Sequence, residues 1–112
     1  MKRKIAIPLE NGVLCQHFGH CTQFSIIETE DNKITGHQKI TPPPHEPGVL
    51  PAWLHSLGVD HIIAGGMGQG ARVIFQERGI TVTVGAPAGP PESLAAAYMR
   101  GTLPTGENVC DH

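Results

Sequence analysis

A proline-rich segment at residues 42–48 divides this 112-residue chain into two parts with different patterns. The segment contains four prolines and ends in a glycine. Because proline lacks a backbone N–H group and has a fixed φ angle, neither a helix nor a central strand can run through such a stretch. We therefore expect a stiff loop at 42–48, with independent secondary structure before and after it.

The part before this loop has the pattern of a small antiparallel sheet. Residues 4–9 are short, apolar and partly β-branched, which predicts a buried strand ended by Pro8. The runs at 24–29 and 34–40 are strand-like and flank a polar turn, so they are expected to form a hairpin.

After the loop, residues at helical spacing alternate with short apolar runs. Helices are expected at 50–57, at 71–78 and at about 91–100, and a glycine follows each of them as a C-terminal cap. The second helix is expected to turn Ala71, Ile74 and Phe75 inward. The apolar runs that precede the second and third helices predict buried strands, at residues 59–64 and 80–84.

The resulting order, β-β-β-α-β-α-β-α, is typical of an α/β fold. Strands that alternate with helices imply right-handed parallel crossovers, and the hairpin adds an antiparallel strand. The chain therefore predicts a three-layer α/β domain with a mixed sheet of about five strands. We expect one domain over residues 1–102, followed by a flexible C-terminal tail over 103–112.

Composition excludes several classes of protein. The formal net charge is −2 and the basic residues are scattered apart from Lys2-Arg3-Lys4, which argues against nucleic acid as a partner. No apolar run approaches the length of about 20 residues needed to span a membrane, and Pro8 and Glu10 interrupt any signal-peptide core. Three cysteines cannot all pair with one another. We expect a cytoplasmic protein with reduced thiols and no membrane partner.

The densest group of metal-binding residue types lies in residues 15–21. This stretch contains two cysteines and two histidines, at positions Cys15, His17, His20 and Cys21. Thiolate and imidazole are the ligands that zinc, copper and iron–sulfur clusters prefer. The spacing matches neither a zinc finger nor a C-x-x-C redox motif, so the alternative is a loop with packed cysteines. We favour a metal-binding loop.

Three further residues are weaker candidates for metal ligands. Cys110 and His112 form a second Cys/His pair in the tail. They become stronger candidates for metal ligands if the tail folds over the 15–21 loop. His45 lies in the proline-rich loop. The remaining histidines, at positions 37, 55 and 61, are expected to be surface or packing residues.

A glycine-rich turn at residues 65–70 connects an expected strand to an expected helix. Backbone N–H groups and the helix dipole favour an anion at such a place. The glycines do not match a dinucleotide-binding motif or a P-loop. The turn predicts either a binding surface that tolerates an anion or simply a tight turn, and its candidate residues for contacts with a cofactor are Gly66, Met67, Gly68, Gly70 and Arg72. A second turn, at 85–90, is expected to line the same edge of the sheet.

No catalytic site is predicted. The chain has only three aspartates, none of them on the first strand, and no serine lies in a nucleophile-elbow motif. A cysteine nucleophile with a histidine base is conceivable at 15–21, but neighbouring thiols tend to oxidise together. We expect a protein that is not an enzyme.

Two blocks of sequence resemble the dinitrogenase iron–molybdenum cofactor biosynthesis family. The similarity spans residues 3–101, and His17-Phe18-Gly19 followed by Gly65-Gly66-Met67-Gly68 is its most specific part. The tail residues Cys110 and His112 resemble an ending found in some members. Cys15, His20 and Cys21 depart from the general motif and are typical of a subgroup with its own ligand.

The resemblance implies a ribonuclease H-like fold and a role in binding metal–sulfur clusters, notably ones that contain molybdenum with iron or copper. Relatives act in nitrogenase cofactor assembly or are linked to molybdenum–copper sulfide clusters. The first hypothesis is therefore a non-catalytic carrier or scaffold that holds such a cluster in a cleft between the 15–21 loop and the glycine-rich turn. Its partners are the cluster and a cofactor-assembly or acceptor protein, and we expect a monomer or weak dimer. The alternative is a regulatory or interaction module that binds zinc through the Cys/His loop and the tail.

Overall fold

Strand β1 (Lys2–Glu10) lies in the middle of a mixed sheet. The computed structural model describes residues 2–16, 18, 21–44 and 48–105, and within them the sheet has six strands. The strands run in the order β4-β3-β1-β5-β6, and the short β2 pairs with the end of β1. The other strands are β2 (Val13–Leu14), β3 (Gln23–Glu30), β4 (Lys33–Ile40), β5 (His61–Ile63) and β6 (Thr81–Thr83).

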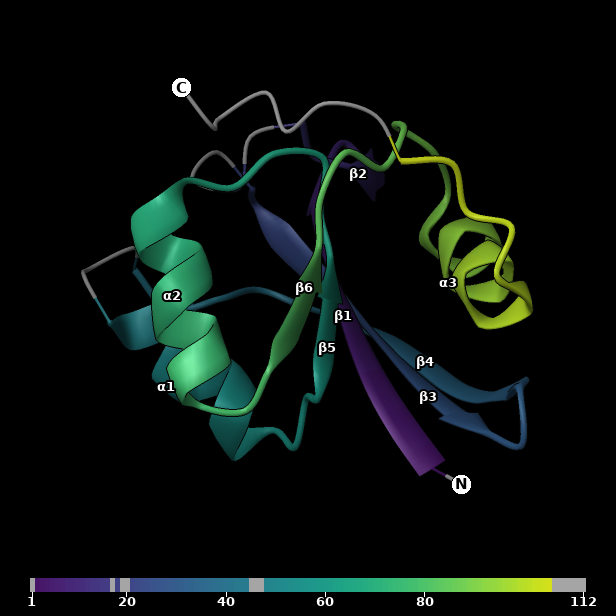
Figure 1. Ribbon diagram of the computed structural model, residues 1–112, viewed down its shortest axis with the longest axis horizontal. Coiled ribbons are helices and arrows are strands. Elements are labelled where there is room, and N and C mark those ends of the chain that lie inside the picture. Colours follow the sequence, from purple (N-terminus) through teal and green to yellow (C-terminus); the bar gives the residue numbers. More distant parts are fainter. Residues whose placement is uncertain (1, 17, 19–20, 45–47, 106–112) are drawn as a thin grey trace.

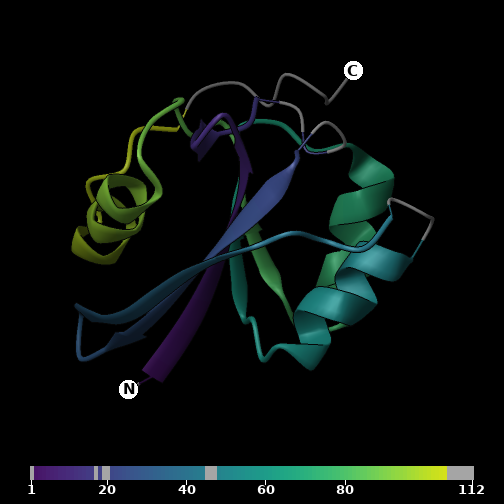
Figure 2. The same cartoon turned by 180° about the vertical axis from the view of Figure 1, so that it is seen from behind.

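The sheet combines antiparallel and parallel pairing as expected. Strands β1, β3 and β4 are antiparallel neighbours, whereas β5 and β6 run parallel to β1. Three helices in the described part of the chain cover the two faces of the sheet. Helices α1 (Val49–Ser56) and α2 (Gln69–Glu77) lie on one face, and α3 (Pro91–Arg100) lies on the other (Figures 1 and 2). The predicted three-layer, ribonuclease H-like α/β architecture is confirmed.

Each face of the sheet has its own hydrophobic cluster, because successive residues of a strand point to opposite sides. On β1, Ala6 belongs to the cluster under α1 and α2, whereas Ile5 and Ile7 belong to the cluster under α3. The first cluster also contains Phe24 and Phe75. Burial of these side chains fixes the register of the sheet, because a slip by one residue would turn each strand inside out.

Three details of the predicted elements are wrong. Pro8 does not end β1, which continues to Glu10, because proline still offers a carbonyl group and Cys15 donates its N–H to that oxygen at 2.9 Å. Strand β2 was not expected, since two residues are too short to show a pattern. Ile74 is 38% exposed rather than turned inward, although Phe75 is fully buried.

The chain turns back after α3. Gly101 has a φ angle of 74°, a conformation that glycine adopts without strain, and it ends the helix there. Residues 101–105 then run along α3 toward the edge of the sheet where β2 lies (Figure 1). Leu103 packs against the hydrophobic cluster under α3. In the described residues, no helix is both long and apolar enough to span a bilayer.

Candidate functional site

The Cys/His loop and the glycine-rich turn meet at one edge of the sheet. Strands β1 and β5 are parallel, so the segments that follow them emerge at the same edge. The N–H group of Phe18 donates to the carbonyl oxygen of Gly66 at 3.0 Å and joins the two segments directly. The structure therefore brings together the two motifs that the sequence analysis singled out.

The two ends of the 15–21 loop are attached to neighbouring residues of β1. Cys15 donates its N–H to the carbonyl of Pro8 at 2.9 Å, and Thr22 donates to that of Leu9 at 2.8 Å. These two bonds fix the points where the loop leaves the sheet and returns to it.

Gly65 permits the close approach of the loop to the turn. A Cβ atom at this position would lie 3.1 Å from Cα of Gln16 and 3.3 Å from the carbonyl oxygen of Cys15. Both are backbone atoms, which cannot move aside as a flexible side chain can. A glycine is therefore required at position 65 by packing rather than by an unusual φ angle.

The turn at residues 85–90 lies beside the same segments, as expected. Gly85 donates its N–H to the carbonyl of Gly65 at 2.8 Å. Leu14, at the end of β2, donates to the carbonyl of Gly89 at 3.0 Å. Three connections that are far apart in the sequence are thus hydrogen-bonded to one another at this edge of the sheet.

Phe18 anchors the middle of the loop in the hydrophobic cluster under α1 and α2. Its ring meets Phe24 edge-on with centroids 5.9 Å apart, and meets Phe75 with centroids 5.6 Å apart. Only 8% of Phe18 is exposed. The aromatic contacts and the bond to Gly66 hold this residue in the core, although its neighbours in sequence are polar or glycine.

The two cysteines of the loop are buried in the same hydrophobic cluster. Cys15 is 3% exposed and Cys21 is 5% exposed. Burial raises the pKa of Cys21 to about 12, because a buried thiolate would lose its contact with solvent. The Cys15 thiol donates to the exposed carboxylate of Glu10 at 3.5 Å. At neutral pH Cys21 is therefore a thiol, and a metal ion must displace its proton to bind there.

Residues of the glycine-rich turn fall into two groups. Gly66 is buried and Met67 is fully buried, so both belong to the core as well as to the turn. Among the described residues, Gly68 and Gly70 have no atom within 4 Å of the place where a Cβ would be, and neither has a positive φ angle. Neither packing nor backbone conformation therefore requires glycine at positions 68 and 70.

Helix α2 begins at this turn without side-chain capping. Its N-cap residue is Gly68, and its first turn contains no acidic residue. The first N–H groups of a helix and the helix dipole favour an anion. Arg72 is half-buried one turn further on, and its N–H group donates to the carbonyl of Gly68 at 3.1 Å. An anionic ligand here would meet open backbone and a nearby guanidinium group.

Five of the predicted metal ligands lie outside the residues that the structure describes: His17, His20, His45, Cys110 and His112. Among the residues that it does describe, no group of three or more His, Cys, Asp and Glu side chains is arranged to hold a metal ion. Cysteine sulfur fits a metal–sulfur ligand chemically. However, Cys15 and Cys21 are turned into the core rather than presented as ligands.

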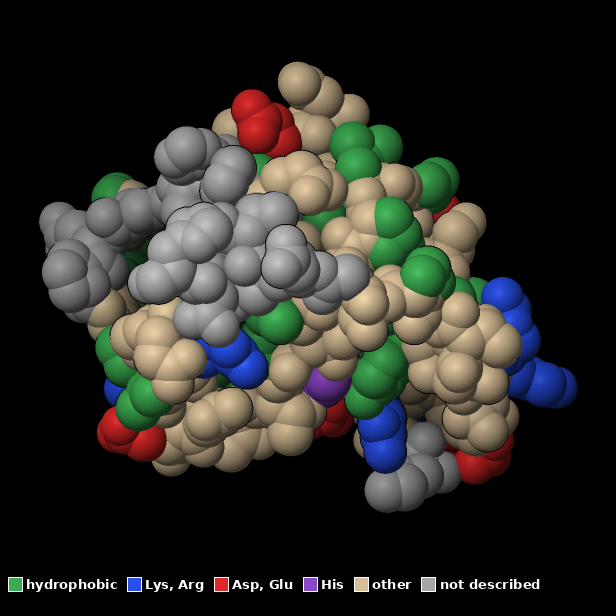
Figure 3. Space-filling model, turned by 45° about the horizontal axis from the view of Figure 1, so that its top comes forward, with side chains coloured by type: hydrophobic (Ala, Val, Ile, Leu, Met, Phe, Trp, Pro, Cys, Tyr) green, Lys and Arg blue, Asp and Glu red, His purple; other side chains and the backbone are tan. Residues whose placement is uncertain are grey.

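The described surface around this edge carries few charges. In Figure 3, which brings the top of the molecule forward, apolar side chains and polar atoms cover most of the described surface, and the charged side chains lie mainly toward its margins. Glu10, Cys15, Cys21 and Arg72 are the described residues with ionisable side chains that we place at the site.

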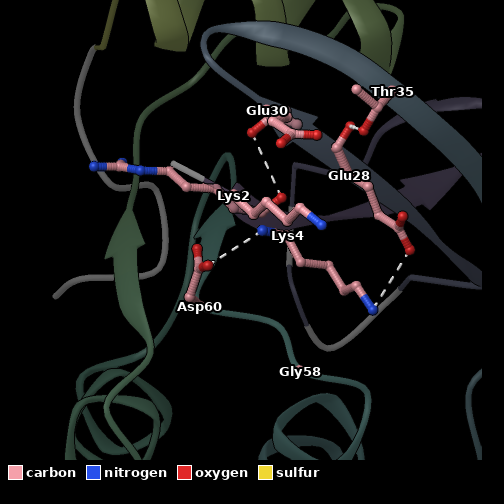
Figure 4. A pocket seen from close by; sticks show the side chains of 9 residues that line it. Lys2, Lys4, Glu28, Glu30, Thr35, Gly58 and Asp60 are labelled. Atoms are coloured by element: carbon pink, nitrogen blue, oxygen red, sulfur yellow. Dashed lines mark hydrogen bonds and ion pairs between the residues drawn. The ribbon is translucent and has the colours of Figure 1, made fainter.

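A cavity of about 340 Å³ lies at the opposite end of the sheet, where β1 begins (Figure 4). The charged groups that line this cavity largely pair with one another. Lys4 lies 3.5 Å from the carboxylate of Glu28, and the backbone N–H of Lys4 donates to Asp60 at 3.2 Å. Lys4 also donates from Nζ to the carbonyl of Leu57 at the end of α1. The cavity is far from both predicted motifs, and its ion pair and hydrogen bonds have structural roles.

The three histidines expected to be background residues have ordinary surroundings. His55 is exposed on α1. His37 contacts Ser25 and Glu92, and His61 is buried between two threonines and Tyr98. None of the three lies at the edge formed by the loop and the turn.

Comparison with known proteins agrees with the sequence blocks described above. A family model described as "Dinitrogenase iron-molybdenum cofactor" matches residues 1–101. The chain belongs to this family. The uncharacterized protein MJ0580 of Methanocaldococcus jannaschii is 36% identical over 84 residues, which are 70% of this chain and 71% of that protein.

Two solved structures of other proteins have a fold similar to that of this chain. The crystal structure of the protein PH0822 has a TM-score of 0.86 and 25% identity, and the match covers 94% of this chain and 96% of that one. The apo form of the orange protein from Desulfovibrio gigas has a TM-score of 0.77 and 17% identity, with 95% and 94% of the two chains covered. The second likeness shows the fold alone.

Two residues of the site were missed by reasoning from the sequence. Phe18 was quoted only as part of a motif, although it is the residue that joins the loop to the turn. Glu10 was noted only as a break in an apolar run, although its carboxylate contacts Cys15. A large apolar residue inside a polar, cysteine-rich loop was the available signal for Phe18, whereas nothing in the sequence pointed to Glu10.

Proposed function

We propose that this protein is a non-catalytic carrier or scaffold for an anionic metal–sulfur cluster that contains molybdenum with iron or copper. The cluster is the cargo, and it would sit at the edge of the sheet formed by the 15–21 loop and the glycine-rich turn. Membership of the dinitrogenase iron–molybdenum cofactor family supports this class of cargo.

The observation that carries the proposal is the hydrogen bond from Phe18 to Gly66, 3.0 Å long. It brings a loop rich in metal-binding residue types against a turn with an open, uncapped helix N-terminus. Soft ligands and an anion-favouring backbone are the two features that a metal–sulfide anion needs from a protein.

The chemistry of the cargo explains why few protein ligands are needed. A preformed cluster brings its own sulfide, so the protein has to supply contacts at the edges and compensation for charge. We assign the edge contacts to His17 and His20, with Cys15, Cys21 and Cys110 as conditional ligands and His112 and His45 as candidates. The N–H groups near Gly66, Gly68 and Gly70, together with Arg72, offset the negative charge of the cluster.

Reconstitution under anaerobic conditions tests the proposal. The protein is incubated with molybdate, sulfide, and either copper or iron, then desalted and followed by visible absorption and elemental analysis. We expect a charge-transfer band and stoichiometric molybdenum in the wild type, and loss of both in the His17→Ala/His20→Ala double variant. A wild type that gains no more colour than this variant would contradict the proposal.

The same experiment distinguishes the zinc alternative. A zinc module would retain about one zinc ion per chain without added metal and would have no colour. In that case deletion of residues 106–112, which keeps Leu103 on the core, should lower the thermal stability of the zinc-bound protein, because the binding energy of the metal becomes folding energy.

Cargo is delivered to another protein, so we also propose a cofactor-assembly or acceptor protein as a partner. Pull-down with cluster-loaded protein and with metal-free protein tests this step. Recovery of the same partners from both forms would contradict a role that depends on the cargo.

A further inference from the structure

A second cavity, of about 480 Å³, lies beside the one around Lys4, on the face of the sheet that carries α3. It is lined by Lys2, Arg3, Asp60, His61, Thr81 and Tyr98. Sites that hold small molecules have volumes of about 300–1,000 Å³, so this cavity is large enough for one. Because β1, β5 and β6 all begin at this end of the sheet, the cavity is separate from the edge proposed for the cluster.

The strand residues on this face change from apolar to polar toward the cavity. Ile5 and Ile63 belong to the hydrophobic cluster under α3. Arg3 and His61 lie two positions earlier on the same strands, and therefore on the same face of the sheet. Thr81 is the partner of His61 on β6. The cavity is therefore lined by groups that can form hydrogen bonds, where an apolar core would otherwise continue.

The hydrogen bonds around His61 leave the hydroxyl hydrogen of Tyr98 for a ligand. Thr81 donates its hydroxyl to the carbonyl of Asp60 at 3.3 Å, so its oxygen accepts the Nδ1–H of His61. Nε2 of His61 then accepts from the hydroxyl of Thr83 at 2.8 Å. The hydroxyl of Tyr98 lies 3.5 Å from Nδ1, which already carries a hydrogen in this arrangement and does not accept another.

Arg3 supplies positive charge beside this hydroxyl. Among the described residues its guanidinium group makes one side-chain hydrogen bond, to Tyr98 at 3.3 Å, and no ion pair. Since a guanidinium group has five N–H donors, most of them remain for a ligand. His61 is neutral at pH 7, because burial and the charge of Arg3 lower its pKa to about 4. Lys2 adds a second positive charge to the lining and Asp60 a single negative one, so positive charge is in excess.

We propose that Arg3 and the hydroxyl of Tyr98 bind the carboxylate or phosphate group of a small anionic molecule in this cavity. The planar fork of a guanidinium group matches two oxygens of either group, and the neighbouring hydroxyl donates to an oxygen as well. The site uses neither the 15–21 loop nor the glycine-rich turn. It therefore goes beyond the proposed function and does not depend on it.

The only tyrosine of the chain gives a probe that needs no assignment of signals. Metal-free protein labelled with ¹³C in the tyrosine ring is titrated at pH 7 with sodium phosphate or sodium acetate, and NMR follows the ring signals. Sodium chloride keeps the ionic strength constant, so that screening does not change. We expect a saturable shift in the millimolar range, and the anion that binds more tightly identifies the preferred group. A shift that does not saturate, or no shift, with both anions would overturn the inference.

A matched pair of variants separates binding by Arg3 from general attraction of anions to the protein. Arg3→Gln removes the charge and the fork, and should weaken binding by about tenfold or more. Arg78→Gln loses the same charge from an exposed position at the end of α2, and should bind within about twofold of the wild type. Equal weakening in the two variants, or an unchanged affinity in Arg3→Gln, would overturn the inference.

Arg3→Lys provides a second measurement if Arg3→Gln does not fold. It keeps the positive charge but lacks the planar fork, and should weaken binding by about threefold or more. An affinity equal to that of the wild type would contradict binding by the guanidinium group. Failure of the reconstitution experiment, with these anion results as expected, would reject the cluster proposal and leave the anion site in place.

Discussion

At the scale of single residues, glycines only a few positions apart in one turn serve different purposes. Gly65 is needed because the backbone of the 15–21 loop lies against it. Gly68 and Gly70 have open space around them and negative φ angles, so a larger residue would fit. No described part of the chain needs glycine at these two positions, so their backbone is open to a ligand as far as the described residues go.

This difference gives the first prediction. Gly65→Ala should destabilise the protein by about 1–3 kcal/mol, because the added Cβ forces backbone atoms of the loop apart. Gly68→Ala, as the matched control, should change stability by no more than about 0.5 kcal/mol. Urea unfolding followed by circular dichroism measures both. Equal effects of the two substitutions would show that the close contact at Gly65 is not restrictive.

A second residue-level prediction concerns His61. Its ring nitrogens contact the hydroxyl groups of Thr81 and Thr83, and its ring stacks on Tyr98 with centroids 4.3 Å apart. Burial, together with the positive charge of Arg3, lowers the pKa of His61 to about 4. The unfolded chain therefore binds a proton at this residue at a higher pH than the folded protein does.

The direction in which stability changes with pH follows from this difference between the folded and unfolded states. The contribution of His61 to stability is fully present above about pH 6.5 and is lost as the pH falls toward 4. It amounts to about 3 kcal/mol across that window. Unfolding free energies measured from pH 7 to 4 should fall less steeply in His61→Gln than in the wild type. The exposed His55→Gln variant should follow the wild type, and an unchanged slope in His61→Gln would contradict the assignment.

At the scale of elements, helix α3 is attached to the sheet by two separate polar contacts. Near its start, Glu92 lies 3.1 Å from Nδ1 of His37, whose Nε2 lies 2.5 Å from the hydroxyl oxygen of Ser25. Toward its end, the hydroxyl of Tyr98 accepts from Arg3 at 3.3 Å. Although the Ser–His–Glu connectivity resembles that of a hydrolase, Ser25 is fully buried, so the chain of contacts is structural.

The contacts of His37 predict coupling between two residues that do not touch. A carboxylate only accepts, so Glu92 takes the Nδ1–H and leaves Nε2 of neutral His37 to accept from Ser25. Ser25→Ala should cost about 1 kcal/mol, and Glu92→Gln about 0.5–1 kcal/mol. A double-mutant cycle should show coupling of about 0.5 kcal/mol. Strict additivity would mean that His37 does not link them.

The elements differ in how well the sequence predicted them. Helix α3 has the expected bounds, because Pro91 and Gly101 mark its ends and propensity agrees with packing. Strand β1 is longer than expected because its hydrogen bonds to β3 continue beyond Pro8, which local pattern does not reveal. Ile74 was misplaced because helical spacing gives the apolar face only approximately, and Phe75 takes the core position.

The arrangement of the candidate site was predictable only in part. Residue types and the position of turns after parallel strands were enough to predict that the loop and the glycine-rich turn meet. The burial of Cys15 and Cys21 was not predictable, because cysteine is both a metal ligand and a core residue. The roles of His17, His20, His45, Cys110 and His112 stay predictions.

At the scale of the whole molecule, the two ends of the sheet differ in chemistry. One end carries the loop, the glycine-rich turn and open backbone, whereas the other carries charges that pair with one another around Lys4. After α3 the chain returns toward the first end, and Leu103 packs on the core along the way. We infer that the domain extends at least to Leu103, slightly beyond the expected boundary at residue 102.

Truncation tests this boundary. A chain that ends at residue 101 loses Leu103 and the bond from Thr102 to the carbonyl of Ala97, and should be less stable by about 1 kcal/mol. A chain that ends at residue 105 keeps both and should unfold like the full-length, metal-free protein. Thermal unfolding without metal measures the difference. Equal midpoints for the two truncated chains would place the boundary before Thr102.

The attachment of the 15–21 loop to adjacent carbonyl groups of β1 has a consequence for protein engineering. Because Pro8 and Leu9 hold its entry and exit points, the five residues between the cysteines form a cassette whose ends are already positioned. Segments of equal length from related proteins could be exchanged there, provided that an aromatic residue is kept at position 18. A library of such exchanges on this scaffold can be screened for loops that bind a chosen metal.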